Sequence, residues 1–283
     1  MTPTCCKLLL AFFLLFCWIG IPQSFADIVP ISVSQQVSVS GSATACDPGC
    51  EMGYGVQHDG QNFSSANSNI TLPTTNISQD GSVDDQFPLP FFDPPIIRDA
   101  SVDASASQTS VLTSNNLNVG LSVSADFSGS SDLMFGSAVA TSQYSLVFDL
   151  TNPYVMEISG VIGGEGMNHS GVDGPDGYVD GEIHLTGPGL RFDQVLTFPM
   201  DSSSNQPFDQ FLTLGPGQYT LNVVAGLDGQ QPDILNSSAV LSSNLNADFT
   251  PAVPEPAHVA PFLGFLTIIG FFFARGRAAV VFR

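Results

Sequence analysis

The stretch Tyr219-Thr-Leu-Asn-Val223 places an apolar residue at every second position, and Ile31-Ser-Val-Ser34 does the same near the start of the chain. Successive side chains of a β-strand point to opposite faces, so this alternation predicts strands with one buried and one wet face. Other short runs rich in β-branched and aromatic residues are bounded by clusters of Gly, Pro, Ser, Asn and Asp, which are typical of turns. The predicted strands are 28–43, 116–127, 137–150, 154–162, 178–185, 192–198, 208–214, 218–227 and 238–250.

These strands predict an all-β fold, because no stretch of residues 27–256 offers three turns of apolar residues at helical spacing. Nine strands joined by short loops are typical of an antiparallel β-sandwich, here expected to be of jelly-roll type. Residues 44–100 are less regular and include the proline-rich stretch from Phe87 to Pro95. Since proline cannot donate to a strand ladder, we expect this segment to be an irregular insertion draped over the sandwich.

Charge is distributed unevenly along the 283 residues, whose net charge is −20. All 26 acidic residues lie between Asp27 and Glu255, where the only bases are Arg98 and Arg191, so this middle part carries a net charge of −24. A surface this acidic repels phosphate backbones, which excludes nucleic acid as a partner.

The first 26 residues have the layout of a secretory signal peptide. Lys7 precedes the apolar run from Leu8 to Ile21, and the small-residue pattern Ser24-Phe-Ala26 follows. A basic start, an apolar stretch of about 7 to 15 residues and small residues at the cleavage site define such peptides. We therefore expect cleavage after Ala26 and export of the chain, with an uncleaved anchor helix as the alternative.

The other end of the chain carries a second apolar segment, residues 257–274, which stops at Arg275-Gly-Arg277. Eighteen residues of helix reach roughly 27 Å, close to the thickness of a bilayer core of about 30 Å. Because positive residues stay on the cytoplasmic side, Arg275 and Arg277 act as a stop-transfer element, and the acidic middle part is expected outside. We predict one transmembrane helix here.

Val253-Pro254-Glu255-Pro256 stands directly before this segment. The order of motif, short apolar span and terminal arginines resembles the PEP-CTERM sorting signal of Gram-negative bacteria. The resemblance covers about the last 30 residues and implies recognition of Pro254, Glu255 and Pro256 by a membrane-embedded exosortase, which cuts near the motif and passes the protein to the cell surface or extracellular matrix. Two prolines fix φ and hold the chain extended, which suits a protease groove.

The chain is therefore expected to have three parts: a signal peptide (1–26), an acidic ectodomain (27–250) and a sorting tail (251–283), which by the resemblance passes through the inner membrane. Residues 212–225 also resemble a hairpin found near the end of many ectodomains of this family, with Gly215-Pro-Gly217 as its tight reversal.

Two kinds of candidate site remain in the middle part. Cys46 and Cys50 flank a Pro-Gly turn, and in an oxidising compartment such a pair favours a small-loop disulfide over a metal site. Asp173, Asp176, Asp180 and Glu182 are separated by glycines, as hard cations such as Ca²⁺ require, although the spacing is not that of an EF-hand. Asp180, Glu182 and His184 are expected to share one face of a strand. A solvated acidic strand face is the alternative interpretation.

Asp180 and Glu182 would also suit the carboxylate pair of a polysaccharide hydrolase. No other catalytic motif accompanies them, and Lys7 is the only lysine. We therefore expect a non-enzymatic protein of the cell surface or extracellular matrix, associated with exopolysaccharide. A calcium-dependent, lectin-like carbohydrate-binding module is the alternative, followed by the hydrolase.

Overall fold

The computed structural model describes residues 28–45, 61–69, 74–89, 94, 96–129, 134–168, 176–231 and 237–252. These residues form twelve strands in two antiparallel sheets, which confirms the all-β prediction and the two-sheet sandwich. The jelly-roll subtype stays a prediction. Within the described ranges no helix is long and apolar enough to cross a bilayer, and the two predicted routing segments lie outside these ranges.

The first sheet has the order β2-β1-β6-β11-β8-β9. Its strands are β2 (Gln61–Asn69), β1 (Val29–Ala45), β6 (Met134–Leu150), β11 (Gly217–Gln231), β8 (Asp176–Gly187) and β9 (Leu190–Pro199).

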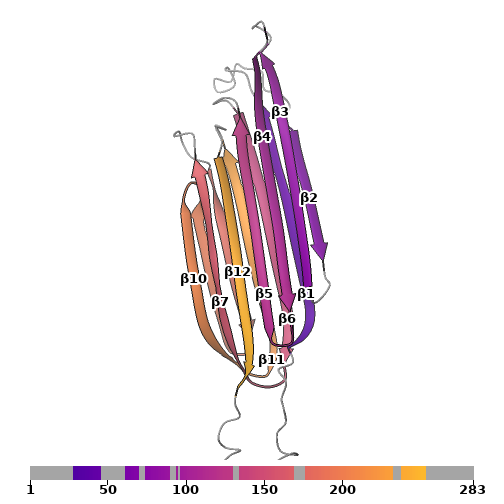
Figure 1. Cartoon of the computed structure of the whole chain (residues 1–283), viewed down its shortest axis with the longest axis vertical. Helices are drawn as coiled ribbons and strands as arrows, with labels where there is room; N and C mark the ends of the chain where they lie inside the picture. The colour runs from indigo at the N-terminus through magenta and orange to yellow at the C-terminus, as the bar shows by residue number, and fades with distance from the viewer. Residues whose placement is uncertain are drawn as a thin grey trace, which may run out of the picture. The chain divides into compact units, whose positions relative to one another are not determined.

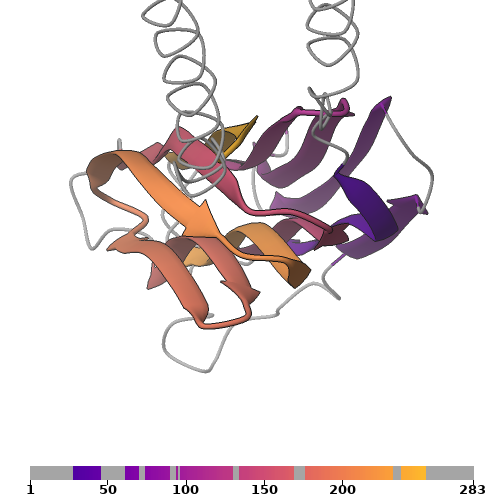
Figure 2. The ribbon, with the colours of Figure 1, turned by 90° about the horizontal axis from the view of Figure 1, so that it is seen from below.

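The second sheet has the order β10-β7-β12-β5-β4-β3, which Figure 1 shows from left to right. Its strands are β10 (Ser203–Leu214), β7 (Tyr154–Asn168), β12 (Ser237–Pro251), β5 (Asn116–Gly129), β4 (Ile96–Leu112) and β3 (Thr74–Leu89). Figure 2 looks along the strands and shows the sheets as two layers.

All nine predicted strands are present, most of them longer than predicted. The longest have 17 residues, and at about 3.3 Å per residue each extends roughly 56 Å. Buried and half-exposed positions alternate along them, so one face of each sheet is apolar and packs inward while the other is polar and faces solvent.

The irregular insertion predicted at 44–100 is wrong for its described residues. β2, β3 and the start of β4 lie in this range and pair in both sheets. β2 and β3 are edge strands, which need fewer apolar residues than central ones, and an edge also accommodates Pro88 because its missing N–H can face solvent. β4 was not predicted because most of its buried positions hold alanine or a polar residue rather than a β-branched or aromatic one: Ala100, Ala104, Ala106, Gln108 and Ser110.

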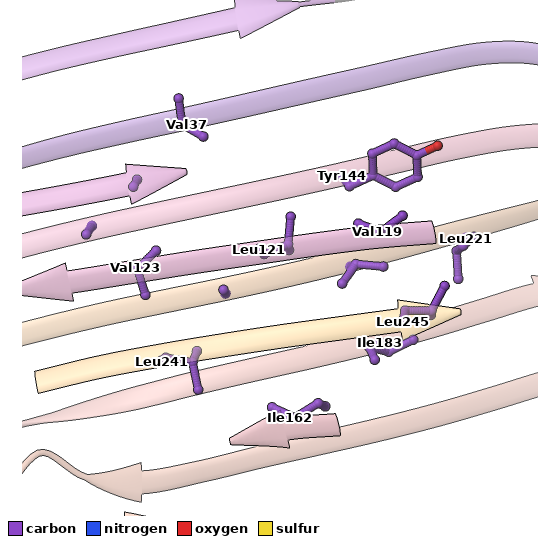
Figure 3. Close-up of a cluster of buried hydrophobic side chains, with 14 of the residues drawn as sticks. Val37, Val119, Leu121, Val123, Tyr144, Ile162, Ile183, Leu221, Leu241 and Leu245 are labelled. Atoms are coloured by element: carbon purple, nitrogen blue, oxygen red, sulfur yellow. The ribbon is translucent and has the colours of Figure 1, made fainter. Parts of the chain in front are cut away.

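The core lies between the sheets, where strands β1, β6 and β11 face β4 and β5. Figure 3 shows Val37, Tyr144 and Leu221 of the first sheet with Leu121 and Leu241 of the second. Phe148 stacks on Tyr219 and meets Phe249 edge-on, with 5.6 Å between ring centroids in both pairs. Each such ring contributes about 1.5–3 kcal/mol by leaving water.

The segment with Gly215 and Pro216 is not the reversal of a hairpin. β10 pairs with β7 in the second sheet, whereas β11 pairs with β6 and β8 in the first, so these two residues carry the chain from one sheet to the other. The Tyr219 hydroxyl donates to the Gly215 carbonyl oxygen at 3.0 Å and fastens this crossing. The ring of Tyr219 is 1% exposed, and burial raises the pKa of its hydroxyl.

Candidate functional site

The β8–β9 hairpin positions the charged residues that the sequence singled out. Gly187 pairs with Leu190, so Pro188 and Gly189 form a two-residue connection. Gly189 has φ +69°, which a residue after proline in a tight turn requires and which glycine adopts without steric cost. This turn sets the register that places His184 opposite Asp193 and Asp180 opposite Thr197.

Four charged side chains on the outer face of this hairpin are joined by a continuous chain of hydrogen bonds. Arg191 Nε donates to Asp193 Oδ2 at 2.5 Å, and Asp193 Oδ1 lies 2.7 Å from His184 Nδ1. On its other side His184 Nε2 lies 3.0 Å from Glu182 Oε2. Since a carboxylate only accepts, both ring nitrogens donate when both carboxylates are ionised, and this geometry is that of an imidazolium. We call Glu182, His184, Arg191 and Asp193 the charged row.

The electrostatics of the charged row agree with this geometry. The hydrogen bond to Asp193 is the main cause that raises the pKa of His184, and Glu182 adds to it by hydrogen bond and charge. Hydrogen bonds from His184 and then Arg191 lower the pKa of Asp193. About a third of each carboxylate side chain is exposed, so water screens these interactions.

Two of the four predicted calcium ligands, Asp180 and Glu182, have described side chains. Asp180 and Glu182 share the outer face of β8 with His184, as predicted, while Val179, Ile183 and Leu185 are buried. Asp180 accepts a hydrogen bond from Thr197 Oγ1 at 2.7 Å. Asp176 begins β8, and Asp173 lies outside the described residues. Among the residues that the structure describes, no group of three or more potential ligands is gathered for a metal, and calcium binding stays a prediction.

A neutral hollow of about 540 Å³ opens on the outer face of the second sheet. Its rim comes from neighbouring positions of four strands: Thr109 of β4 is opposite Gly120 of β5, which is opposite Asn244 of β12, and Ser159 of β7 adds a hydroxyl. None of its described lining residues is charged. Amides and hydroxyls of this kind are suited to hydrogen bonding with a neutral polar ligand.

A second hollow, of about 500 Å³, lies on the same face over β3, β4 and β5 and is acidic. Asp103 is directly opposite Asp126, and Asp80 contributes a third carboxylate. Burial and then the charges of Asp84 and Asp126 raise the pKa of Asp103. The two hollows thus differ in charge although one sheet carries both.

The sequence did not indicate several of these residues. Arg191 and Asp193 join the charged row only through the register of the hairpin, and Asn244, Gly120 and Thr109 are far apart in the chain. The sequence offers one signal for these residues. Each lies at an outward position of a strand with alternating burial, which predicts only that it faces solvent. The remaining predicted residues lie outside the described ranges: Cys46, Cys50, the motif from Val253 to Pro256, Arg275 and Arg277.

No family model and no curated relative matches the chain. Among solved structures, a Family 16 Carbohydrate Binding Module-2 is similar with 12% identity and a TM-score of 0.15, covering 52% of this chain and 85% of that one. The infectious bursal disease virus Gt strain is similar with 10% identity and a TM-score of 0.19, covering 84% and 69%. A VP2 subviral particle of that virus has 10% identity and a TM-score of 0.17, covering 82% and 68%. TM-scores this low carry no argument about this chain.

Proposed function

We propose that this chain is an exported, non-enzymatic protein of the cell surface or extracellular matrix, associated with exopolysaccharide and delivered by its C-terminal sorting signal. Val253-Pro254-Glu255-Pro256, the apolar segment 257–274 and the terminal arginines support the route. An exosortase-type enzyme is the partner in transit, and the inner membrane holds the intermediate. The ectodomain is then an acidic sandwich of jelly-roll type.

The polar exterior of both sheets is the observation that carries the proposed role. Short hydroxyl and amide side chains line the outward positions and bond across strands, as Ser42 does with Ser137 at 2.8 Å and Ser105 with Ser124 at 2.7 Å. Hydroxyls of a polysaccharide form hydrogen bonds with the same groups. Long strands repeat these positions many times, so numerous weak contacts with a polymer add up.

A calcium-dependent, lectin-like module remains the alternative, because Asp180 and Glu182 do lie together on the outer face of β8. Asp180 bonds to the neutral Thr197, and Glu182 bonds to the His184 imidazolium. A cation bound by both carboxylates would have to displace at least the imidazolium. The same pair would serve the less favoured hydrolase. A melting temperature unchanged by millimolar calcium would remove the calcium-dependent alternative.

Replacing Val253-Pro-Glu-Pro256 by four alanines tests the sorting proposal. We expect the variant to accumulate in the inner-membrane fraction, because the processing enzyme loses the extended segment that it recognises. Pro251→Ala, just upstream of the motif, is the matched control and should reach the surface like the natural chain. Unchanged surface delivery of the four-alanine variant would refute the proposed route.

A further inference from the structure

The neutral hollow adjoins another one on the same sheet. A third hollow, of about 500 Å³, lies over β7, β10 and β12, and Val161 lines both it and the neutral hollow. The two adjoining hollows, here together called the cross-strand groove, lie over β4, β5, β12, β7 and β10. Four strand spacings of about 4.8 Å give it a length of roughly 19 Å, which suits a chain-like ligand rather than a single small molecule.

Gly120, at an outward position of β5, forms the floor of this groove. Gly160 also borders it, but Gly160 pairs with the buried Phe208, so its missing side chain faces the interior of the sandwich. A Cβ on Gly120 would lie 2.9 Å from Thr109 Oγ1 and 3.2 Å from Asn244 Oδ1, so these two side chains converge over the glycine. The missing side chain at Gly120 leaves room for these two polar groups to lie together, where one ligand can meet both.

Polar and apolar groups alternate along the walls. The Asn244 amide makes no hydrogen bond with another described residue and is exposed, so its donor and acceptor are both available. Val111 and Val240 are each 40% exposed and give apolar surface on either side of it. A sugar ring has hydroxyls at its edge and C–H groups on its faces, and this mixture of amide, hydroxyl and aliphatic side chains matches both.

The charge of the groove selects among polysaccharides. Glu165, near β10, is the only charged residue among the described residues that line it, in a middle part of net charge −24. An anionic polymer would be repelled by the surrounding surface and would find no cation in the groove. A neutral polymer pays no such penalty and exchanges water for amide and hydroxyl partners.

We propose that the cross-strand groove binds one strand of a neutral polysaccharide, with Asn244 and Thr109 as its hydrogen-bonding residues over the floor at Gly120. This inference rests on the proposed association with exopolysaccharide and names its site and the charge class of the ligand.

Affinity electrophoresis of the purified full-length chain in mild detergent tests it, with dextran, hydroxyethyl cellulose and glucomannan as neutral probes and alginate as the anionic one. We expect at least one neutral polymer to retard the protein and alginate to have no effect. Asn244→Ala removes up to two hydrogen bonds and should weaken the retardation about tenfold. Gly120→Val fills the floor and should weaken it at least as much.

Asn222→Ala is the matched control, because Asn222 is a half-exposed asparagine at an outward position of β11 in the other sheet, and its binding should be unchanged. Circular dichroism and a melting curve identify any variant that fails to fold, and Asn244→Ala, at an exposed position, still decides the question if Gly120→Val does. Three results would overturn the proposed binding site. They are retardation of the natural chain by alginate alone, no retardation by any neutral polymer, and equal retardation of the natural chain and Asn244→Ala. Surface delivery in the four-alanine experiment is independent of these results, so either proposal can fail without the other.

Discussion

His184 lies between two carboxylates, and this position sets the pH range in which the charged row stabilises the fold. Because its pKa is raised, its contribution is fully present below the ordinary value of about 6.5 and is lost as the pH rises through the folded-state pKa. The pKa of Asp193 is lowered, so its contribution is present above about 3.9 and is lost as the pH falls through the folded-state pKa.

We therefore predict a pKa of His184 above 6.5 in a proton NMR titration, and a greater stabilising contribution of the charged row at pH 6 than well above the raised pKa. His184→Gln identifies the resonance. Asp193→Asn should bring the pKa back toward its ordinary value, because the hydrogen bond to a carboxylate that raises it most is lost. An unshifted pKa in the natural chain would contradict the imidazolium geometry.

The sequence predicted part of this site correctly. Alternation alone placed Asp180, Glu182 and His184 on one face, since side chains in a strand repeat every two residues. Arg191 and Asp193 could not be assigned to them, because that requires the pairing register of β8 with β9. In hairpins the register depends on the turn, and the pairing of Gly187 with Leu190 is a feature of the folded backbone.

At the scale of elements, the crossing from β10 to β11 depends on one hydroxyl. Tyr219→Phe removes its hydrogen bond to the Gly215 carbonyl and should lower the free energy of unfolding by about 1 kcal/mol. Tyr178→Phe is the control, because that side chain is 51% exposed on the outer face of β8 and should change stability little. Chemical denaturation of both variants measures the difference, and equal effects would show that the Tyr219 hydroxyl does not fasten the crossing.

Strands with large buried residues were predictable and strands with small ones were not. β6 carries Tyr144, Leu146 and Phe148 at alternate buried positions, a pattern that only a strand explains. β4 buries Ala100, Ala104 and Ala106 instead, and alanine has no preference for strands. β4 is nevertheless a strand because β3 and β5 pair with it on both sides, a long-range cause that local composition does not reveal.

At the scale of the whole molecule, acidic charge dominates the middle part of the chain, between Asp27 and Glu255. Mutual repulsion of like charges opposes compaction, and salt screens it over a Debye length that falls from about 30 Å at 0.01 M to 3 Å at 1 M. We predict a melting temperature that rises with sodium chloride over this range at pH 7. Near pH 4, where carboxylates approach neutrality, the rise should shrink. A salt response of equal size at both pH values would mean that repulsion among carboxylates is not its cause.

Both described ends of the sandwich are held at one turn. The Ile28 N–H donates to the Ser114 carbonyl at 3.4 Å, and the Phe249 N–H donates to the Asn115 carbonyl at 2.8 Å. β1 therefore begins, and β12 ends, at the same pole of the two sheets. Tension applied between the two ends of the domain would peel each strand from that pole, breaking its ladder one rung after another instead of shearing all rungs together. The long strands thus stabilise the folded state, but they give the domain little resistance to a force that pulls its two ends apart.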